Sequence, residues 1–248
     1  MSKNRNKILV IVEGERTDVR LMKRLLDIYG LSDRHEIVSY NTDIYTLYKE
    51  MFEDEDPNSM DILQVLRGRE KDNEKKSLFD PLYSDILLIF DLDPQSHSFD
   101  EDKVRRMQAF FHESSDMGKL YINYPMVESF YHMTAIPDPD YYKRSATMSE
   151  LSEGLYKMRV NRENRNHDYS KFAVTKDECD ILISQNLFKG SLISGESRSD
   201  RPDDIKILEK QLELIKDKSE VWVLCTCCYY IFDFNPRFLS THPSEFAN

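Results

Sequence analysis

Apolar runs alternate with amphipathic segments along the first half of the chain. The runs at residues 7–12 and 85–90 are almost entirely apolar and bounded by polar residues, which is typical of strands buried on both faces of a sheet. Weaker strand patterns follow at residues 35–40 and 119–123. Helices are expected between the strands, at residues 17–30, 44–52, 60–66 and 101–113. This alternation predicts an α/β fold, with a mostly parallel sheet and helices on both faces.

The second half of the chain has a different pattern. From residue 141 onward strand signals are few, and helices are expected at residues 149–159, 176–185, 203–214 and 221–232. In the first half, the charged residues 67–76 have no apolar periodicity and predict a surface loop. No internal repeat or low-complexity linker separates the halves. We therefore expect an α/β domain at residues 1–135 and a mainly helical region at residues 136–248 packed on it.

Composition limits the class of protein. The 248 residues are 40% apolar, which is ample for a core, and no stretch of about 18 uncharged apolar residues occurs. Residues 1–7 lead into the first strand without a signal-peptide pattern, so we expect a soluble, cytoplasmic protein with no membrane partner. The cysteines lack the paired spacing of a zinc site and are expected as buried, reduced thiols, at Cys179, Cys225, Cys227 and Cys228.

The charge balance restricts how the chain could bind nucleic acid. The net charge is -11, from 45 acidic and 34 basic residues, so bulk attraction to a phosphate backbone is excluded. Any contact must be local or bridged by metal. The basic stretch at residues 157–165 and the bases near it are candidates for such contacts, and a solvated helix face or loop is the alternative. The candidate residues are Lys143, Arg144, Arg159, Arg162 and Arg165.

Carboxylates follow the two most apolar strands. The first run ends in Glu13 and Gly14, and the second ends in Asp91 and Asp93, which are two residues apart and so point to the same side of the strand. The carboxyl ends of parallel strands meet in the crevice where ligands bind. Several carboxylates there repel one another unless a cation lies between them, and Mg²⁺ and Mn²⁺ prefer oxygen ligands. The pattern therefore predicts a metal site.

Two further acids are candidates for the same site. Glu128 follows Pro125 just after the strand at residues 119–123, which brings it near the same sheet edge. Asp18 is the second residue of the first expected helix, for which Thr17 is the expected N-cap. For both acids, the alternative is a surface carboxylate favoured by the helix dipole.

Taken together, these motifs resemble the Toprim domain, over roughly residues 7–133. Toprim domains carry a Glu-Gly motif after the first strand and an Asp-x-Asp motif after a later one, and Glu13-Gly14 and Asp91-Leu92-Asp93 match them in order. The segment from Pro125 to Glu128 is similar to the Pro-x-x-Glu segment of small Toprim proteins encoded near prokaryotic defence systems. These include the RloB-like group and the overcoming-lysogenization-defect nucleases.

The resemblance implies a Toprim-like, Rossmannoid metal-binding domain that hydrolyses phosphodiester bonds in DNA or RNA with Mg²⁺ or Mn²⁺, in prokaryotic anti-phage defence. Glu13, Asp91 and Asp93 would be catalytic and hold one or two ions, with Glu13 as a candidate general base. Asp18 and Glu128 would complete or orient a second metal position. The chain has no Gly-x-x-x-x-Gly-Lys-Ser/Thr motif, so an ATPase would be a separate protein partner.

Departures from the Toprim pattern define the alternatives. Many Toprim nucleases have a lysine where this chain has Glu15, and a glycine after Asp-x-Asp where this chain has residues 94–96, Pro-Gln-Ser. These departures favour a catalytically silent, Toprim-like metal- and nucleic-acid-binding or regulatory module that requires a partner. A phosphatase of the haloacid dehalogenase class also uses Asp-x-Asp, but it expects threonine at the position of Gln95. No tyrosine among the 14 stands out as a topoisomerase nucleophile.

Overall fold

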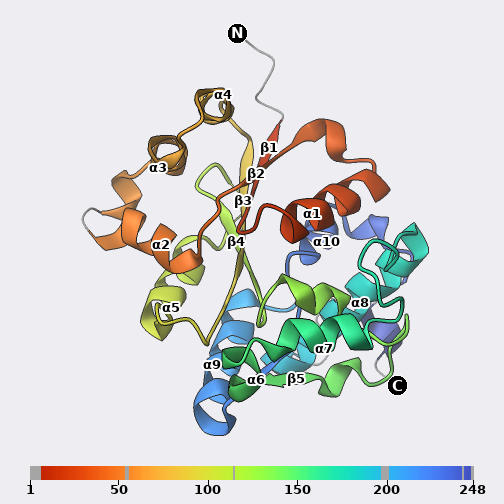
Figure 1. The fold of residues 1–248 in the computed structure, drawn as a ribbon. Helices are drawn as coiled ribbons and strands as arrows, with labels where there is room; N and C mark the ends of the chain where they lie inside the picture. The colour runs from red at the N-terminus through yellow and green to blue at the C-terminus, as the bar shows by residue number, and fades with distance from the viewer. Residues whose placement is uncertain (1–6, 54–55, 114, 197–200, 242, 247–248) are drawn as a thin grey trace.

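A parallel sheet lies at the centre of the protein (Figure 1). The computed structural model describes residues 7–53, 56–113, 115–196, 201–241 and 243–246, and within these ranges the sheet has four strands in the order β2-β1-β3-β4. The strands are β1 (Ile8–Val12), β2 (His35–Ser39), β3 (Asp85–Asp91) and β4 (Lys119–Asn123). In the register, Ile8 lies opposite both His35 and Asp85, which aligns the carboxyl ends of β1, β2 and β3.

Helices cover both faces of this sheet. One face carries α2 (Ile44–Tyr48), α3 (Ile62–Arg69) and α5 (Glu101–Phe110), and the other carries α1 (Thr17–Ile28) and α10 (Tyr229–Phe234) (Figure 1). All five residues of β1 are buried, as a strand covered on both sides requires. The predicted α/β fold with a parallel sheet between helical layers is confirmed.

Local capping explains where the first half differs from expectation. The first helix begins at Thr17, so Arg16 takes the N-cap position without a side-chain hydrogen bond, and the prediction of Thr17 as N-cap is wrong. Gly30, at φ +68°, follows the end of α1 as predicted. The predicted loop at residues 67–76 is also wrong, since it contains the end of α3 and the short helix α4 (Asn73–Lys76). Asp72 caps α4 by accepting the backbone N–H of Glu74.

The second half is mostly helical, with a small antiparallel pairing of strands. Its elements before α10 are β5 (Ser145–Thr147), α6 (Met148–Ser152), α7 (Leu155–Glu163), α8 (Lys176–Ser194), α9 (Asp204–Lys218) and β6 (Glu220–Trp222). The helix expected at residues 149–159 is interrupted by Gly154, at φ +69°. The helix expected at residues 221–232 is wrong for residues 221–228, which form the end of β6 and a turn, whereas residues 229–232 lie in α10. A continuous apolar run lacks the periodicity that separates strand from helix.

Both halves contribute to one hydrophobic cluster. It contains Val10 and Phe90 from the central sheet together with Leu187 and Tyr229 from the second half. The backbones of Tyr124 and Leu224 also exchange two hydrogen bonds, each 2.8 Å, so the second half is fastened to the end of β4. Within the described ranges, none of the helices combines the length and apolarity needed to cross a membrane.

Candidate functional site

The carboxyl ends of β1 and β3 form the crevice of the sheet. The chain passes from β1 outward to β2 and then returns to the other side of β1 to form β3, and such a reversal of strand order is where open α/β sheets bind ligands. A cleft of about 480 Å³ opens at this point. Its lining contains all five predicted acids, a sixth acid and two bases: Glu13, Asp18, Asp91, Asp93 and Glu128, then Glu15, then Arg16 and Lys157.

Gly14 allows the first two acids to approach each other. A Cβ atom at this position would lie 2.6 Å from Oδ2 of Asp18, closer than a carbon and an oxygen can pack. Asp18 is the second residue of α1 and is buried, with its Oδ1 atom unpartnered in the part of the chain that the structure describes. The glycine of the Glu-Gly motif thus makes room for a buried carboxylate, not only for a tight turn.

Asp91 and Asp93 are held by different neighbours. Asp91 ends β3, and its Oδ1 accepts a hydrogen bond of 3.3 Å from Nδ2 of Asn123. Asp93 adopts φ +43°, and its Oδ1 accepts a bond of 2.8 Å from Nε2 of Gln95. Leu92, between them, is fully buried. The alternation expected from a strand end therefore turns both carboxylates toward the cleft.

Glu128 and Lys157 line the cleft on another side, Glu128 from the turn after β4 and Lys157 from the second half of the molecule. Glu128 lies in the 3₁₀ turn Val127–Tyr131 and is buried; its Oε1 is 3.2 Å from Nζ of Lys157, and its Oε2 has no partner within the described ranges. Lys157 belongs to α7, which lies beyond the carboxyl ends of the strands (Figure 1). Sequence reasoning missed Lys157 as a site residue, although the basic stretch at residues 157–165 begins with it.

Burial and mutual repulsion raise the pKa values of these acids. Burial, and then the charges of Asp93 and Asp18, raise the pKa of Glu13 to about 8, although the N–H of Asp91 opposes this. Burial followed by the charge of Glu13 raises the pKa of Asp91 well above its usual range. Burial is also the main cause that raises the pKa values of Asp18 and Asp93. Such crowded carboxyls are stabilised by either protons or a cation.

The donor chemistry fits a hard divalent cation. Among the described residues, three buried atoms of the cleft lining have no hydrogen-bond partner, and all three are oxygens: Oδ1 of Asp18, Oε2 of Glu128 and Oε1 of Gln95. Such oxygens are the ligands that Mg²⁺ and Mn²⁺ take. As the side chains lie, however, no group of three or more His, Cys, Asp and Glu residues in the described ranges is arranged to hold a metal ion. Binding would therefore require side-chain rotation.

Four of the five predicted nucleic-acid contacts form ion pairs within the protein, and the pair of Arg162 with Glu163, at 3.4 Å, is the most exposed of them. Arg144 pairs with the buried Asp138 at 2.9 Å. Arg159 pairs with Glu150 at 3.0 Å, and Arg165 pairs with Glu178 at 2.7 Å.

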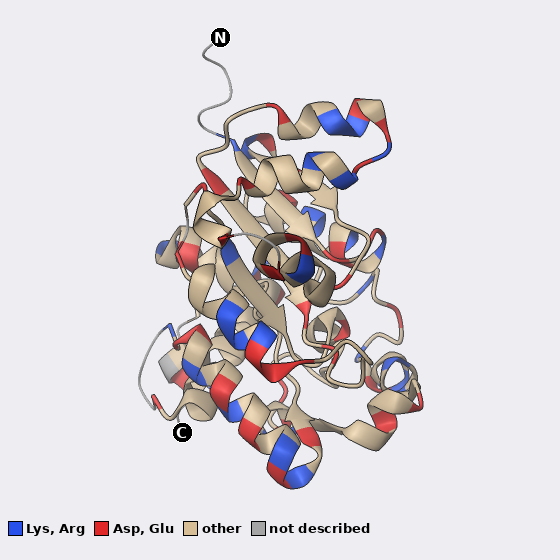
Figure 2. Cartoon of the chain, turned by 90° about the vertical axis from the view of Figure 1, so that its left-hand side faces the viewer, with Lys and Arg blue, Asp and Glu red and all other residues tan. Residues whose placement is uncertain are grey.

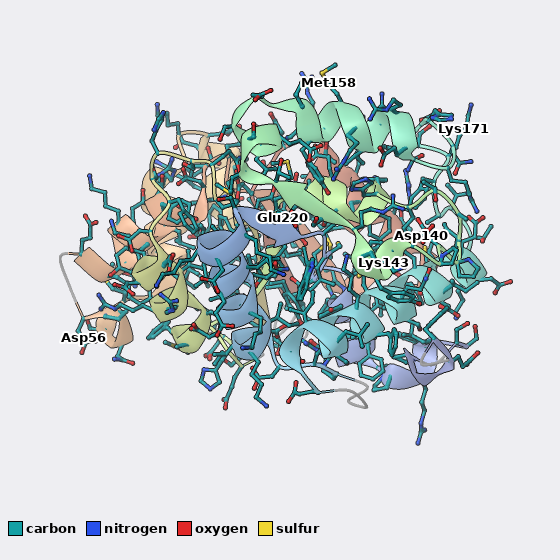
Figure 3. All side chains as sticks on the ribbon, turned by 90° about the horizontal axis from the view of Figure 1, so that it is seen from below. Asp56, Asp140, Lys143, Met158, Lys171 and Glu220 are labelled. Atoms are coloured by element: carbon teal, nitrogen blue, oxygen red, sulfur yellow. The ribbon has the colours of Figure 1, made fainter. Side chains whose placement is uncertain are left out.

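Two of the predicted bases, Lys143 and Arg162, are exposed. In Figure 3, Lys143 lies beside Asp140, away from the outer edge where α7 carries Met158. Figure 2 shows acidic and basic residues interspersed along the helices on its face. Arg144 and Arg162 both lie within 4 Å of the same carboxylate, that of Glu163.

The cysteines are buried with free thiols, as the sequence predicts.

Comparison with known proteins adds no further assignment. No family model matches the chain, and neither a curated protein nor a solved structure matches it. The function of the protein is therefore inferred from the motifs and from the geometry of the cleft.

Proposed function

We propose that this protein is a Toprim-type nuclease that hydrolyses phosphodiester bonds in DNA or RNA with Mg²⁺ or Mn²⁺. The observation that carries the proposal is the meeting of five acids from separate chain segments in one cleft, at the point where the strand order reverses. Structural ion pairs do not account for them, because among the described residues Lys157 is the one base that forms an ion pair with any of these acids, and it pairs with Glu128.

The side chains have distinct roles in this proposal. Glu13, Asp91 and Asp93 hold the cation, and Asp18 and Glu128 complete or orient a second position. A bound divalent cation lowers the pKa of water and offsets charge on the phosphate. Glu13 accepts the proton of the attacking water in this proposal.

Lys157 adds a second base to the cleft, beside Arg16 of the motif region. Its ammonium group lies at the cleft with 62% of the side chain exposed, so it can pair with a phosphate oxygen of the substrate while Glu128 turns to the cation. A protein of net charge -11 then accepts a polyanion through local cations only. The proposed setting is the cytoplasm of a prokaryotic cell in anti-phage defence, with a separate ATPase as partner.

Cleavage assays test the proposal directly. Purified protein is incubated with plasmid DNA, single-stranded DNA and RNA in the presence of Mg²⁺, Mn²⁺ or EDTA. Metal-dependent cleavage that is lost in both Glu13→Ala and Asp91→Ala supports the proposal, and full activity in both variants contradicts it. Lys157→Gln should slow cleavage, whereas the matched control Lys171→Gln, an exposed base remote from the cleft lining, should not.

A second candidate is a Toprim-like module that binds metal or nucleic acid without cleaving it. The internal ion pairs of Arg144, Arg159 and Arg165 favour this interpretation, because they leave few of the predicted bases to hold a substrate. Calorimetry separates the two candidates. Binding of Mn²⁺ without turnover of any nucleic acid, with or without an added ATPase partner, identifies the silent module.

A further inference from the structure

Asn123 connects the second half of the chain to the carboxylates of the cleft. It ends β4 and is fully buried, and its Nδ2 donates to Oδ1 of Asp91 at 3.3 Å. Its Oδ1 accepts the backbone N–H of Cys227 at 3.2 Å and faces the thiol of Cys225 at 3.6 Å. Because a backbone N–H can only donate, the amide oxygen must face Cys227 and the amide nitrogen must face Asp91.

The turn at residues 225–227, which binds Asn123, is itself held by hydrogen bonds to two other segments. The N–H of Cys225 donates to Oδ1 of Asn186 in α8 at 2.9 Å. The hydroxyl of Thr226 donates to the carbonyl of Ile122 at 2.7 Å. Both bonds are buried, so the turn is a rigid support and not a flexible surface loop.

We infer that Asn123 is a positioning residue that orients Asp91 for a divalent cation. The amide nitrogen donates to one oxygen of the Asp91 carboxylate, Oδ1, and Asp91 also lines the cleft, so the other oxygen is left for the cation. Two parts of the second half of the chain thus contribute to the site: Lys157 in the cleft, and the turn at residues 225–227 behind it. This inference rests on the proposed metal-dependent function.

Metal affinity is the first test. Titration of Mn²⁺ followed by calorimetry should show Asn123→Ala binding about 10 to 100 times more weakly than the wild type, as loss of a group that orients a metal ligand does. Thr226→Val is the matched control, because it removes a buried bond from the same turn without touching the amide of Asn123. The control should lose stability but keep its affinity within about twofold, the scatter expected of a bystander substitution.

The outcomes separate this inference from the proposed function. Normal Mn²⁺ binding by the wild type with unchanged affinity in Asn123→Ala contradicts the positioning role alone. So does an equal loss of affinity in Thr226→Val, which would indicate general loosening of the turn. A wild-type protein that binds no Mn²⁺ contradicts the proposed function, and the positioning role with it.

A second measurement requires neither metal nor a change at Asn123. In ¹⁵N NMR spectra, the side-chain amide of Asn123 should give a signal that exchanges slowly with solvent. Asp91→Ala should shift this signal and speed its exchange, whereas Asp93→Ala should leave it nearly unchanged. If Asp91→Ala leaves the position and the exchange rate of this signal unchanged, the inference is wrong. This result does not depend on whether Asn123→Ala folds.

Discussion

Oε2 of Glu13 accepts a hydrogen bond of 3.0 Å from the backbone N–H of Asp91, which joins the ends of β1 and β3. This bond fixes one oxygen of Glu13 and holds the two motif acids together although 78 residues separate them in sequence. The same bond opposes the rise of the Glu13 pKa that burial causes. Glu13 is therefore both part of the sheet and part of the cleft, and the two roles can be separated by substitution.

Glu13→Gln should preserve the fold and remove the chemistry. The amide oxygen of glutamine can still accept the Asp91 N–H, while the negative charge and the general base are lost. We expect thermal stability of the metal-free protein at about pH 8 to match or exceed that of the wild type, because the pKa of Glu13 is raised to about 8. Cleavage should fall by about 10² to 10⁴-fold, the usual contribution of a general base. Cleavage at the wild-type rate would exclude Glu13 from the reaction.

The metal-free protein should lose stability as the pH rises from about 4.5 to about 8. The pKa of Glu13 rises from 4.5 to about 8 on folding, so in this range the folded state holds a proton that the unfolded chain has released. Stability is therefore greatest below the lower value and is lost as the pH passes through the higher one. Thermal melts in EDTA, at pH values from below the lower pKa to above the higher one, measure this change.

Added Mn²⁺ should reverse most of that loss, because it takes the place of the protons and binds only the folded state. The same melts are repeated with Mn²⁺. The matched variant is Asp91→Asn, melted in EDTA, because this substitution removes one of the carboxyl groups that repel one another in the cleft. A melting temperature independent of pH in the wild type would show that the carboxyls do not repel one another as their burial implies.

Gly14→Ala should impair the site with little effect on the fold. The new methyl group would displace the Asp18 carboxylate, which is the flexible end of a side chain. We expect weaker Mn²⁺ binding by calorimetry and a nearly unchanged melting temperature. Gly68→Ala is the control, because nothing lies within 4 Å of the position that its new methyl group would take in α3. It should stabilise the protein by about 0.5 to 1 kcal/mol and leave Mn²⁺ affinity unchanged.

Arg144→Leu and Arg162→Leu should differ in their effect on the free energy of unfolding. The first breaks a pair in which 11% of the arginine side chain and 1% of the Asp138 side chain are exposed, so it should cost about 3 to 5 kcal/mol of unfolding free energy. The second removes an exposed base and should cost less than about 0.5 kcal/mol. Denaturant unfolding measures both.

Arg162→Leu also tests a predicted nucleic-acid contact. If Arg162 contacts phosphate, the slope of log affinity against log salt concentration should fall by about one in this variant. Equal salt slopes in the wild type and Arg162→Leu would remove Arg162 from the proposed interface.

The sequence was most informative where chemistry and burial coincide. The apolar strands before Glu13 and Asp91 were predictable because a strand buried on both faces has no polar alternation. Glu128 could be placed near them because it closely follows the next strand. Five acids that line the cleft could therefore be identified from the sequence alone, whereas Glu15, which also lines it, was not predicted as a site residue.

Contacts between distant segments were not predictable from the sequence. Lys157 reaches Glu128 only because α7 begins anew after Gly154, and a local pattern does not show which helix face will meet the cleft. Asn123 looks like an ordinary strand end, and its role depends on Cys227, far along the chain. The internal pairing of Arg144 likewise follows from tertiary burial, which a run of basic letters cannot reveal.

The proposed metal site can be tested by anomalous diffraction from crystals soaked in Mn²⁺. We expect an anomalous peak in the cleft, coordinated by oxygens of Glu13, Asp91 and Asp93, and loss of that peak in Asp91→Ala crystals grown in the same form. A cleft without a peak in the wild type, or a peak whose ligands exclude all three acids, would contradict a metal site formed by these carboxylates.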